Sequence, residues 1–248
     1  MMKSSWFVFL LTVWWASYSV ANEPVLGLEL EYRLRIDNSA HYNHLWQRLE
    51  SMGLSRSLSV VPLKRAFRDF SKEKDSCIFP TSITALTTSF PEYSTDELIA
   101  STPVDYVSLK VFTRPDEEVV SDLRQLNGKR VAIWNGLDPD IFLNGLDVEV
   151  ESTVDEGVRL KMLYSGRVDA ILGFVPDTLI ASDFLGIERP NAEGAFTYFA
   201  GNGISMVCFD SESNRAFVAQ FNQLINLLRE KGELRRVLGP YVTLEWQP

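Results

Sequence analysis

Residues 155–174 constrain the fold of this chain more than any other part of its sequence. Asp155 can cap the start of a helix, and Gly166 can end that helix in the left-handed conformation. Apolar residues recur at helical spacing across the start and middle of the segment: Val154, Val158 and Met162. The following run, 168–175, has the length and the Ile, Leu and Val content of a parallel strand that is covered on both faces. A helix that leads directly into a buried strand predicts an α/β fold.

The first half of the chain repeats this alternation. An extended run (25–36), a helix (42–52), a strand (57–61), a helix with proline in its first turn (62–70) and a short strand (75–80) follow one another. This order predicts a parallel sheet. Residues 81–103 are rich in Thr, Ser and Pro and carry little periodic signal, and 104–113 predicts a strand that leaves this first unit.

The pattern begins again after Pro115. Strands are predicted at 129–134, 147–151, 168–175 and 203–209, with helices at 155–165 and after Asp138, which is followed by Pro139 at the first helical position. A long helix that ends at Gly232 presents one apolar face, formed by Phe217, Phe221, Leu224 and Leu228.

Three short phrases of the second half resemble one known family. They are Leu-Asn-Gly-Lys-Arg-Val at 126–131, Gly-Arg-Val-Asp-Ala at 166–170 and Leu-Leu-Arg-Glu-Lys-Gly-Glu-Leu at 227–234. In this order and spacing they resemble the periplasmic solute-binding proteins of family 3, the polar amino acid class. The resemblance implies a type II periplasmic-binding-protein fold, with two lobes that close on a small ligand. It places lobe 1 at 22–112 and 204–248 and lobe 2 at 113–203, each a mostly parallel sheet flanked by helices.

The chain departs from the family at three ligand-binding devices. The segment 84–101 lacks the arginine that, in the family, binds the carboxylate of an amino acid with two hydrogen bonds. Leu137 stands where a hydroxyl residue follows glycine at the first helix of lobe 2, and Phe174 stands where an aspartate pairs with the ligand ammonium. These departures argue against a standard α-amino acid, with a shifted register in 81–103 as the alternative explanation for the arginine.

Seven residues are the predicted ligand-binding set, because ligands of open parallel sheets bind at the carboxyl ends of strands: Tyr32, Ser82, Trp134, Asn135, Gly136, Asp138 and Phe174. Trp134 and Phe174 can stack on an aromatic or sugar-like solute, or they can pack between sheet and helices. Asp138 precedes a helix whose N–H groups favour anions, but its own carboxylate can occupy those donors. Arg65 can face the cleft or be a solvated charge.

No residue pattern predicts a catalytic or metal site, and no cofactor is expected. His41 and His44 share a helix face but lack a third ligand, apart from the nearby Asp37. Glu29 and Glu31 alternate onto one strand face without a partner histidine, serine or lysine.

The first 21 residues resemble a cleavable signal peptide. Lys3 precedes an apolar core at 6–15, and small residues at 19 and 21 fit cleavage after Ala21. The core is shorter than the roughly 20 residues that span a bilayer. A periplasmic protein of a Gram-negative cell is therefore expected, with an uncleaved anchor as the alternative.

The charge of the chain is −9, and it becomes −10 without Lys3. An acidic chain without basic clusters argues against nucleic acid and anionic membranes as partners. The two cysteines, Cys77 and Cys208, can form a disulfide in an oxidising compartment, or they can remain free and buried as small hydrophobic residues.

The sequence leaves three functions open. The first is a monomeric periplasmic binding protein that captures a small polar or aromatic solute and can deliver it to an inner-membrane ABC permease. The second is a signalling or accessory module of the same fold that reports to a membrane sensor. The third is a periplasmic enzyme of the dehydratase type, for which Asp138 and Asp177 are the available acid or base groups.

Overall fold

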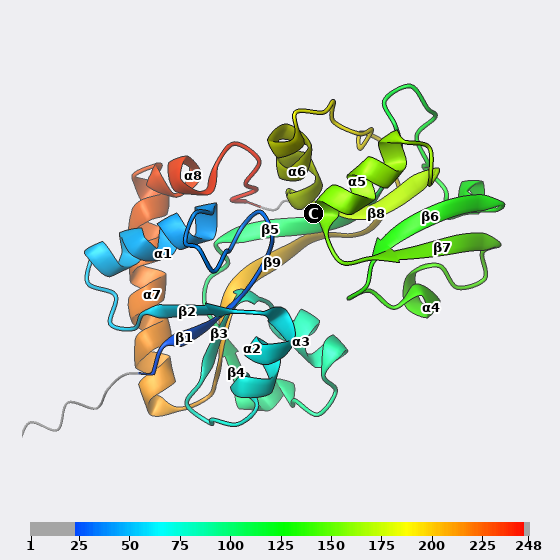
Figure 1. The fold of residues 1–248 in the computed structure, drawn as a ribbon. Coiled ribbons are helices and arrows are strands. Elements are labelled where there is room, and N and C mark those ends of the chain that lie inside the picture. Colours follow the sequence, from blue (N-terminus) through cyan, green and yellow to red (C-terminus); the bar gives the residue numbers. More distant parts are fainter. Residues whose placement is uncertain (1–22, 246–248) are drawn as a thin grey trace, which may run out of the picture.

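The computed structural model describes residues 23–245, and the predicted signal peptide lies outside them. A single mixed sheet of nine strands runs through these residues in the order β2-β1-β3-β9-β5-β8-β6-β7, with β4 paired to β9 (Figure 1). The strands are β1 (Val25–Leu28), β2 (Leu58–Val61), β3 (Cys77–Thr81), β4 (Leu98–Ala100), β5 (Asp105–Phe112), β6 (Lys129–Trp134), β7 (Val148–Thr153), β8 (Ala170–Val175) and β9 (Thr197–Phe209).

The sheet has two parallel parts joined by antiparallel strands. Strands β2, β1 and β3 are parallel neighbours, and so are β8, β6 and β7. Between them, β9 pairs antiparallel with β3 and with β5, and β5 pairs antiparallel with β8. We call the part with β1–β4 lobe 1 and the part with β6–β8 lobe 2. The predicted α/β class and the two-lobed architecture are confirmed.

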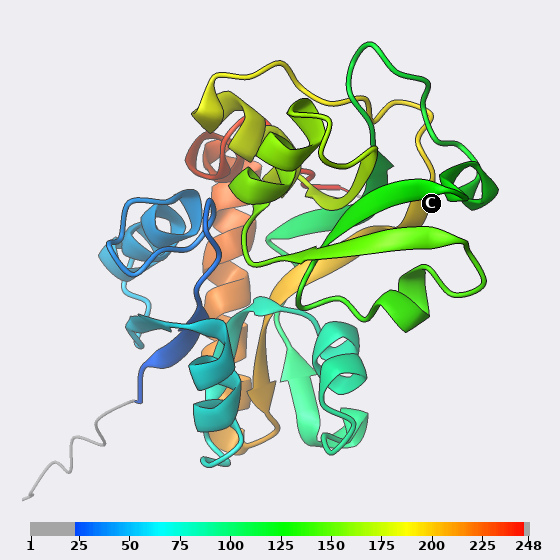
Figure 2. The same cartoon turned by 45° about the vertical axis from the view of Figure 1, so that its right-hand side comes forward.

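Helices cover both faces of each lobe (Figures 1 and 2). Their bounds are α1 (His41–Ser51), α2 (Leu63–Phe70), α3 (Ile83–Ser89), α4 (Pro139–Phe142), α5 (Glu156–Tyr164), α6 (Asp177–Leu185), α7 (Glu212–Glu230) and α8 (Glu233–Leu238), with 3-10 turns η1 (Thr95–Glu97) and η2 (Leu123–Leu126). In lobe 1, α1, α7 and α8 enclose one core cluster, and α2 and α3 enclose another. In lobe 2, η2 and α4 cover one face of the sheet, and α5 and α6 cover the other.

The segment that led to the fold prediction has the expected structure. The Asp155 carboxylate accepts a hydrogen bond from the Val158 N–H, and Gly166 has a φ of 70° after the end of α5. The buried face of the helix differs from the simplest interpretation of its pattern. Val154 and Val158 are exposed, and the side of α5 that faces the sheet contains Leu160 and Leu163.

Three other predictions about elements were wrong or incomplete. The extended run predicted for 25–36 ends at Leu28, because the chain turns back at Leu30, which pairs with Leu34. Residues 81–103 contain α3 and β4, whose short lengths leave little periodicity to detect. The helix α6 was missed, since its apolar residues lie on more than one side.

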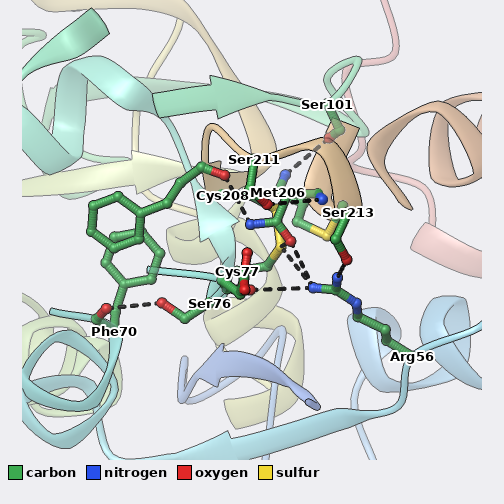
Figure 3. The surroundings of a disulfide bond; sticks show 12 residues. Arg56, Phe70, Ser76, Cys77, Ser101, Met206, Cys208, Ser211 and Ser213 are labelled. Carbon is green, nitrogen blue, oxygen red and sulfur yellow. Dashed lines mark hydrogen bonds between the residues drawn. A yellow bond between two sulfur atoms is a disulfide. The ribbon is translucent and has the colours of Figure 1, made fainter. Parts of the chain in front are cut away.

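Cys77 and Cys208 are joined in a disulfide, which settles one alternative that the sequence left open (Figure 3). The two residues lie directly opposite each other on β3 and β9, and both are buried. Next to them, the Arg56 guanidinium donates to the Asn214 side-chain oxygen at 2.8 Å and to the Ser213 hydroxyl at 2.9 Å. The disulfide therefore lies inside lobe 1, in a region that is already tightly bonded.

Candidate functional site

The predicted ligand-binding residues lie at or after the carboxyl ends of four strands. Tyr32 follows β1, Ser82 follows β3, Phe174 lies near the end of β8, and 134–138 span the end of β6 and the turn into α4. Among residues 23–245, no hydrogen bond or aromatic pair joins a predicted residue of lobe 1 to one of lobe 2. The ligand-binding set therefore stays a prediction.

Two polar members of the set already bond their own helices. The Ser82 hydroxyl accepts from the Ala85 N–H at 3.0 Å, and the Asp138 carboxylate accepts from the Asp140 N–H at 3.0 Å. These are N-cap interactions that satisfy backbone donors at the start of α3 and α4. Asp138 thus occupies a donor that an anionic ligand would need.

The aromatic members are half-buried at the junction of the cores. Phe174 contacts the core clusters of both lobes and pairs with Phe199 of β9, with ring centroids 6.2 Å apart. The Trp134 ring lies over Gly136, where a Cβ atom would come within 2.3 Å of the ring. This close approach favours glycine in the turn, because a Cβ atom would displace the ring. Phe199 was missed because the sequence predicted only the second half of β9.

A buried charge network between the lobes was also missed. Arg33, only 7% exposed, donates through Nε to the Asp177 carboxylate at 2.8 Å, across the junction between lobe 1 and lobe 2. Through Nη1 it donates to the Tyr42 hydroxyl at 2.9 Å and to the Asp105 carboxylate at 3.4 Å. Burial opposes the charge of Arg33, but the two carboxylates outweigh this effect and raise its pKa. An arginine inside the extended run predicted for 25–36 gives no sequence signal of such partners.

A second buried cluster lies at the start of α5. The Glu156 carboxylate accepts from the Thr178 hydroxyl at 2.8 Å and from the Arg159 guanidinium. Gly173 of β8 makes room for it, because a Cβ atom there would lie 2.3 Å from the Thr178 hydroxyl. Burial raises the pKa of Glu156 to about 7, although Arg159 and the Thr178 hydrogen bond oppose the shift.

This shift predicts a pH dependence of stability. The folded state keeps the Glu156 proton at pH values where the unfolded state has lost it. The contribution of this proton to the free energy of unfolding is therefore complete below about pH 4.5 and is lost as the pH rises through about 7. The expected slope is up to about 1.4 kcal/mol per pH unit in that window. Urea denaturation at a series of pH values measures it. Glu156→Gln should remove this part of the slope, and equal slopes in both proteins would contradict the assignment.

A hollow on the described surface lies apart from the predicted site. It has a volume of about 470 Å³ and lies between β5, the end of β8, α6 and the segment that leads into β9. Its lining is mostly apolar, with Lys110 and Glu193 as the charged members. None of the seven predicted residues lines it, so the hollow gives no support to the predicted ligand set.

Two general properties bear on function. Within 23–245, no group of three or more His, Cys, Asp or Glu side chains is arranged to hold a metal ion. Over the same residues, no helix has both the length and the apolar character needed to cross a bilayer.

No protein-family model matches the sequence, and no curated protein matches it. Solved structures do match. An arginine transport periplasmic binding protein from Legionella pneumophila has 15% identity and a TM-score of 0.55, over 88% of this chain and 99% of that one. A histidine kinase sensor domain with similarity to periplasmic binding proteins has 16% identity and a TM-score of 0.61, over 87% and 94%. An ancestral amino acid-binding protein, a precursor of cyclohexadienyl dehydratase, has 11% identity and a TM-score of 0.62, over 90% and 96%.

These likenesses define the fold of the molecule. The chain has the two-lobed fold of the periplasmic binding proteins, and its structural neighbours include amino-acid-binding proteins of the family 3 type that the sequence phrases resemble. At such low identities the likeness shows the fold alone, so the chain is a divergent representative of that fold.

Proposed function

We propose that this chain is a periplasmic binding protein that captures a small, uncharged polar or aromatic solute between its lobes. The fold supports a binding role, and its parallel strands end at the edge where ligands of such sheets bind. The observation that carries the choice of solute is Phe174, which packs on Phe199 at the position where the family pairs an aspartate with a ligand ammonium. Delivery to an inner-membrane permease is part of the proposal.

A thermal-shift screen of the mature protein against uncharged metabolites and standard amino acids tests the binding role. A solute at 100 times its Kd adds about 2.7 kcal/mol to the free energy of unfolding. For a chain of this size, that raises the Tm by about 5–10 °C. A screen in which only charged amino acids raise the Tm would contradict the choice of solute, and native mass spectrometry of protein purified gently from the periplasm identifies a retained one.

A variant pair locates the binding. Phe174→Leu keeps an apolar side chain at the junction but removes the aromatic face, so it should reduce the solute-induced Tm shift by more than half. Phe196→Leu is the matched control, because Phe196 packs on the same lobe 2 core and pairs with Tyr198 but is not a predicted ligand residue. Equal losses in the two variants would count against Phe174 as a binding residue.

A sensor or accessory module is the second candidate. The observation in its favour is the buried Arg33–Asp177 pair, which joins the lobes with the chain's own residues. Exposed apolar side chains on both lobes, among them Ile36 and Phe184, are compatible with a membrane partner. The enzymatic alternative has less support, since Asp138 caps a helix and Asp177 is paired with Arg33.

A further inference from the structure

Three consecutive residues of lobe 1 each reach a different group of lobe 2. The Glu31 carboxylate accepts from the Glu156 N–H, at the start of α5, at 3.1 Å. The Tyr32 ring meets the Phe184 ring of α6 edge to face, with centroids 5.5 Å apart. The Arg33 guanidinium pairs with Asp177, the first residue of α6. An anion, an aromatic ring and a cation are thus presented side by side to lobe 2.

The lobe 2 surface is shaped to receive this segment. Gly157 lies beneath the Tyr32 side chain, and a Cβ atom there would come within 2.8 Å of the Tyr32 hydroxyl. The Asp155 carboxylate accepts a hydrogen bond from the Val158 N–H. The neighbouring Glu156 N–H donates instead to the Glu31 carboxylate. A carboxylate at this position also interacts favourably with the positive end of the α5 dipole.

The Arg33–Asp177 pair is the strongest of these contacts. The two side chains are 8% and 15% exposed, and the second Asp177 oxygen is buried without a hydrogen-bond partner among the described residues. Separating the lobes would break the one charge pair that the described residues form with Asp177. A further contact joins Tyr241 of the C-terminal segment to Arg189 and Asp183 of lobe 2. It is exposed, so it adds much less.

We propose that residues 31–33 act as a tethered internal ligand, which holds the lobes closed when no solute is present. The segment presents an anion, an aromatic ring and a cation from lobe 1 to lobe 2, and it thereby bridges the lobes as a bound solute would. It is joined covalently to lobe 1, so its effective concentration at lobe 2 is high. Closure of the lobes then needs no solute. This role of residues 31–33 goes beyond the proposed capture of a solute and holds whether or not a solute binds.

The test uses solute-free mature protein, after partial unfolding and dialysis to remove any bound molecule. Hydrogen exchange of the Glu156 amide and small-angle scattering are measured for the wild type and for Glu31→Ala/Asp177→Ala. The wild type should scatter as calculated for the structure in which residues 31–33 contact lobe 2. The double variant should show a larger radius of gyration and roughly tenfold faster exchange at Glu156, the fold-change of a contact worth about 1.4 kcal/mol.

Two further variants separate the tether from general destabilisation. Gly157→Gln removes no charge and suits a helix, but it fills the space beneath Tyr32, so it should also open the lobes. Asp169→Ala breaks the Arg130–Asp169 pair inside lobe 2 and should leave scattering unchanged. A solute-free wild type that is already open would overturn the proposal. So would a double variant that behaves like Asp169→Ala.

Discussion

Replacing Arg33 with methionine is expected to lower the free energy of unfolding by about 3–5 kcal/mol, the range for removing one partner of a buried charge network. Methionine retains much of the apolar stem but cannot neutralise Asp105 or Asp177. Asp105 is 2% exposed, and burial already raises its pKa. Loss of the guanidinium should therefore leave a buried carboxylate that is charged at a high free-energy cost or protonated.

Denaturant unfolding of the two proteins at neutral pH measures this effect. Arg35→Met is the matched control, because Arg35 lies two residues away and its exposed guanidinium binds the Asp37 carboxylate and the Glu31 backbone oxygen. That exposed pair should contribute little. If both variants lost the same stability, the burial of the Arg33 network would not be the source of the effect.

Replacing both cysteines with alanine is the second large effect expected. The disulfide links positions 131 residues apart, and closing a loop of that length in the unfolded chain corresponds to about 5 kcal/mol in the chain-entropy model. Both side chains are buried, so the loss of two sulfur atoms adds a small packing cost. The expected total is about 4–5 kcal/mol, since disulfides often deliver less than the model value.

Guanidinium unfolding of Cys77→Ala/Cys208→Ala gives this value directly. Reduction of the wild type under the same conditions is the companion measurement, and the two should agree within about 1 kcal/mol if the effect comes from the covalent link. A loss of under about 1 kcal/mol in both would show that the loop between β3 and β9 is restricted without the disulfide.

The sequence predicted the architecture well because it depends on local patterns. Asp155, Gly166 and the apolar run after them are sufficient to define a helix and a buried strand, and both formed. The same patterns, repeated in order, predicted an α/β fold, and the resemblance to the family implied its two lobes. Where the pattern was weak, as in the short helix α3 and the short strand β4, the prediction failed.

The site was harder to predict because it depends on partners far apart in the chain. Arg33 and Asp177 are separated by 144 residues, and neither lies in a phrase that the family resemblance covers. The cysteines show the same difficulty, since spacing alone could not decide whether they were bonded. The prediction of the seven ligand residues depends only on their places at the ends of strands, so a binding measurement is needed to test it.

The continuity of β9 has a mechanical consequence. Its C-terminal half pairs with β3 and β4 and includes Cys208 of the disulfide, whereas its first half pairs with β5 along the way to lobe 2. The β5–β9 register is irregular on either side of Leu109. Since the covalent link stiffens the far end of β9, torsion between the lobes would be taken up in that irregular stretch, and it would act as the pivot of the molecule.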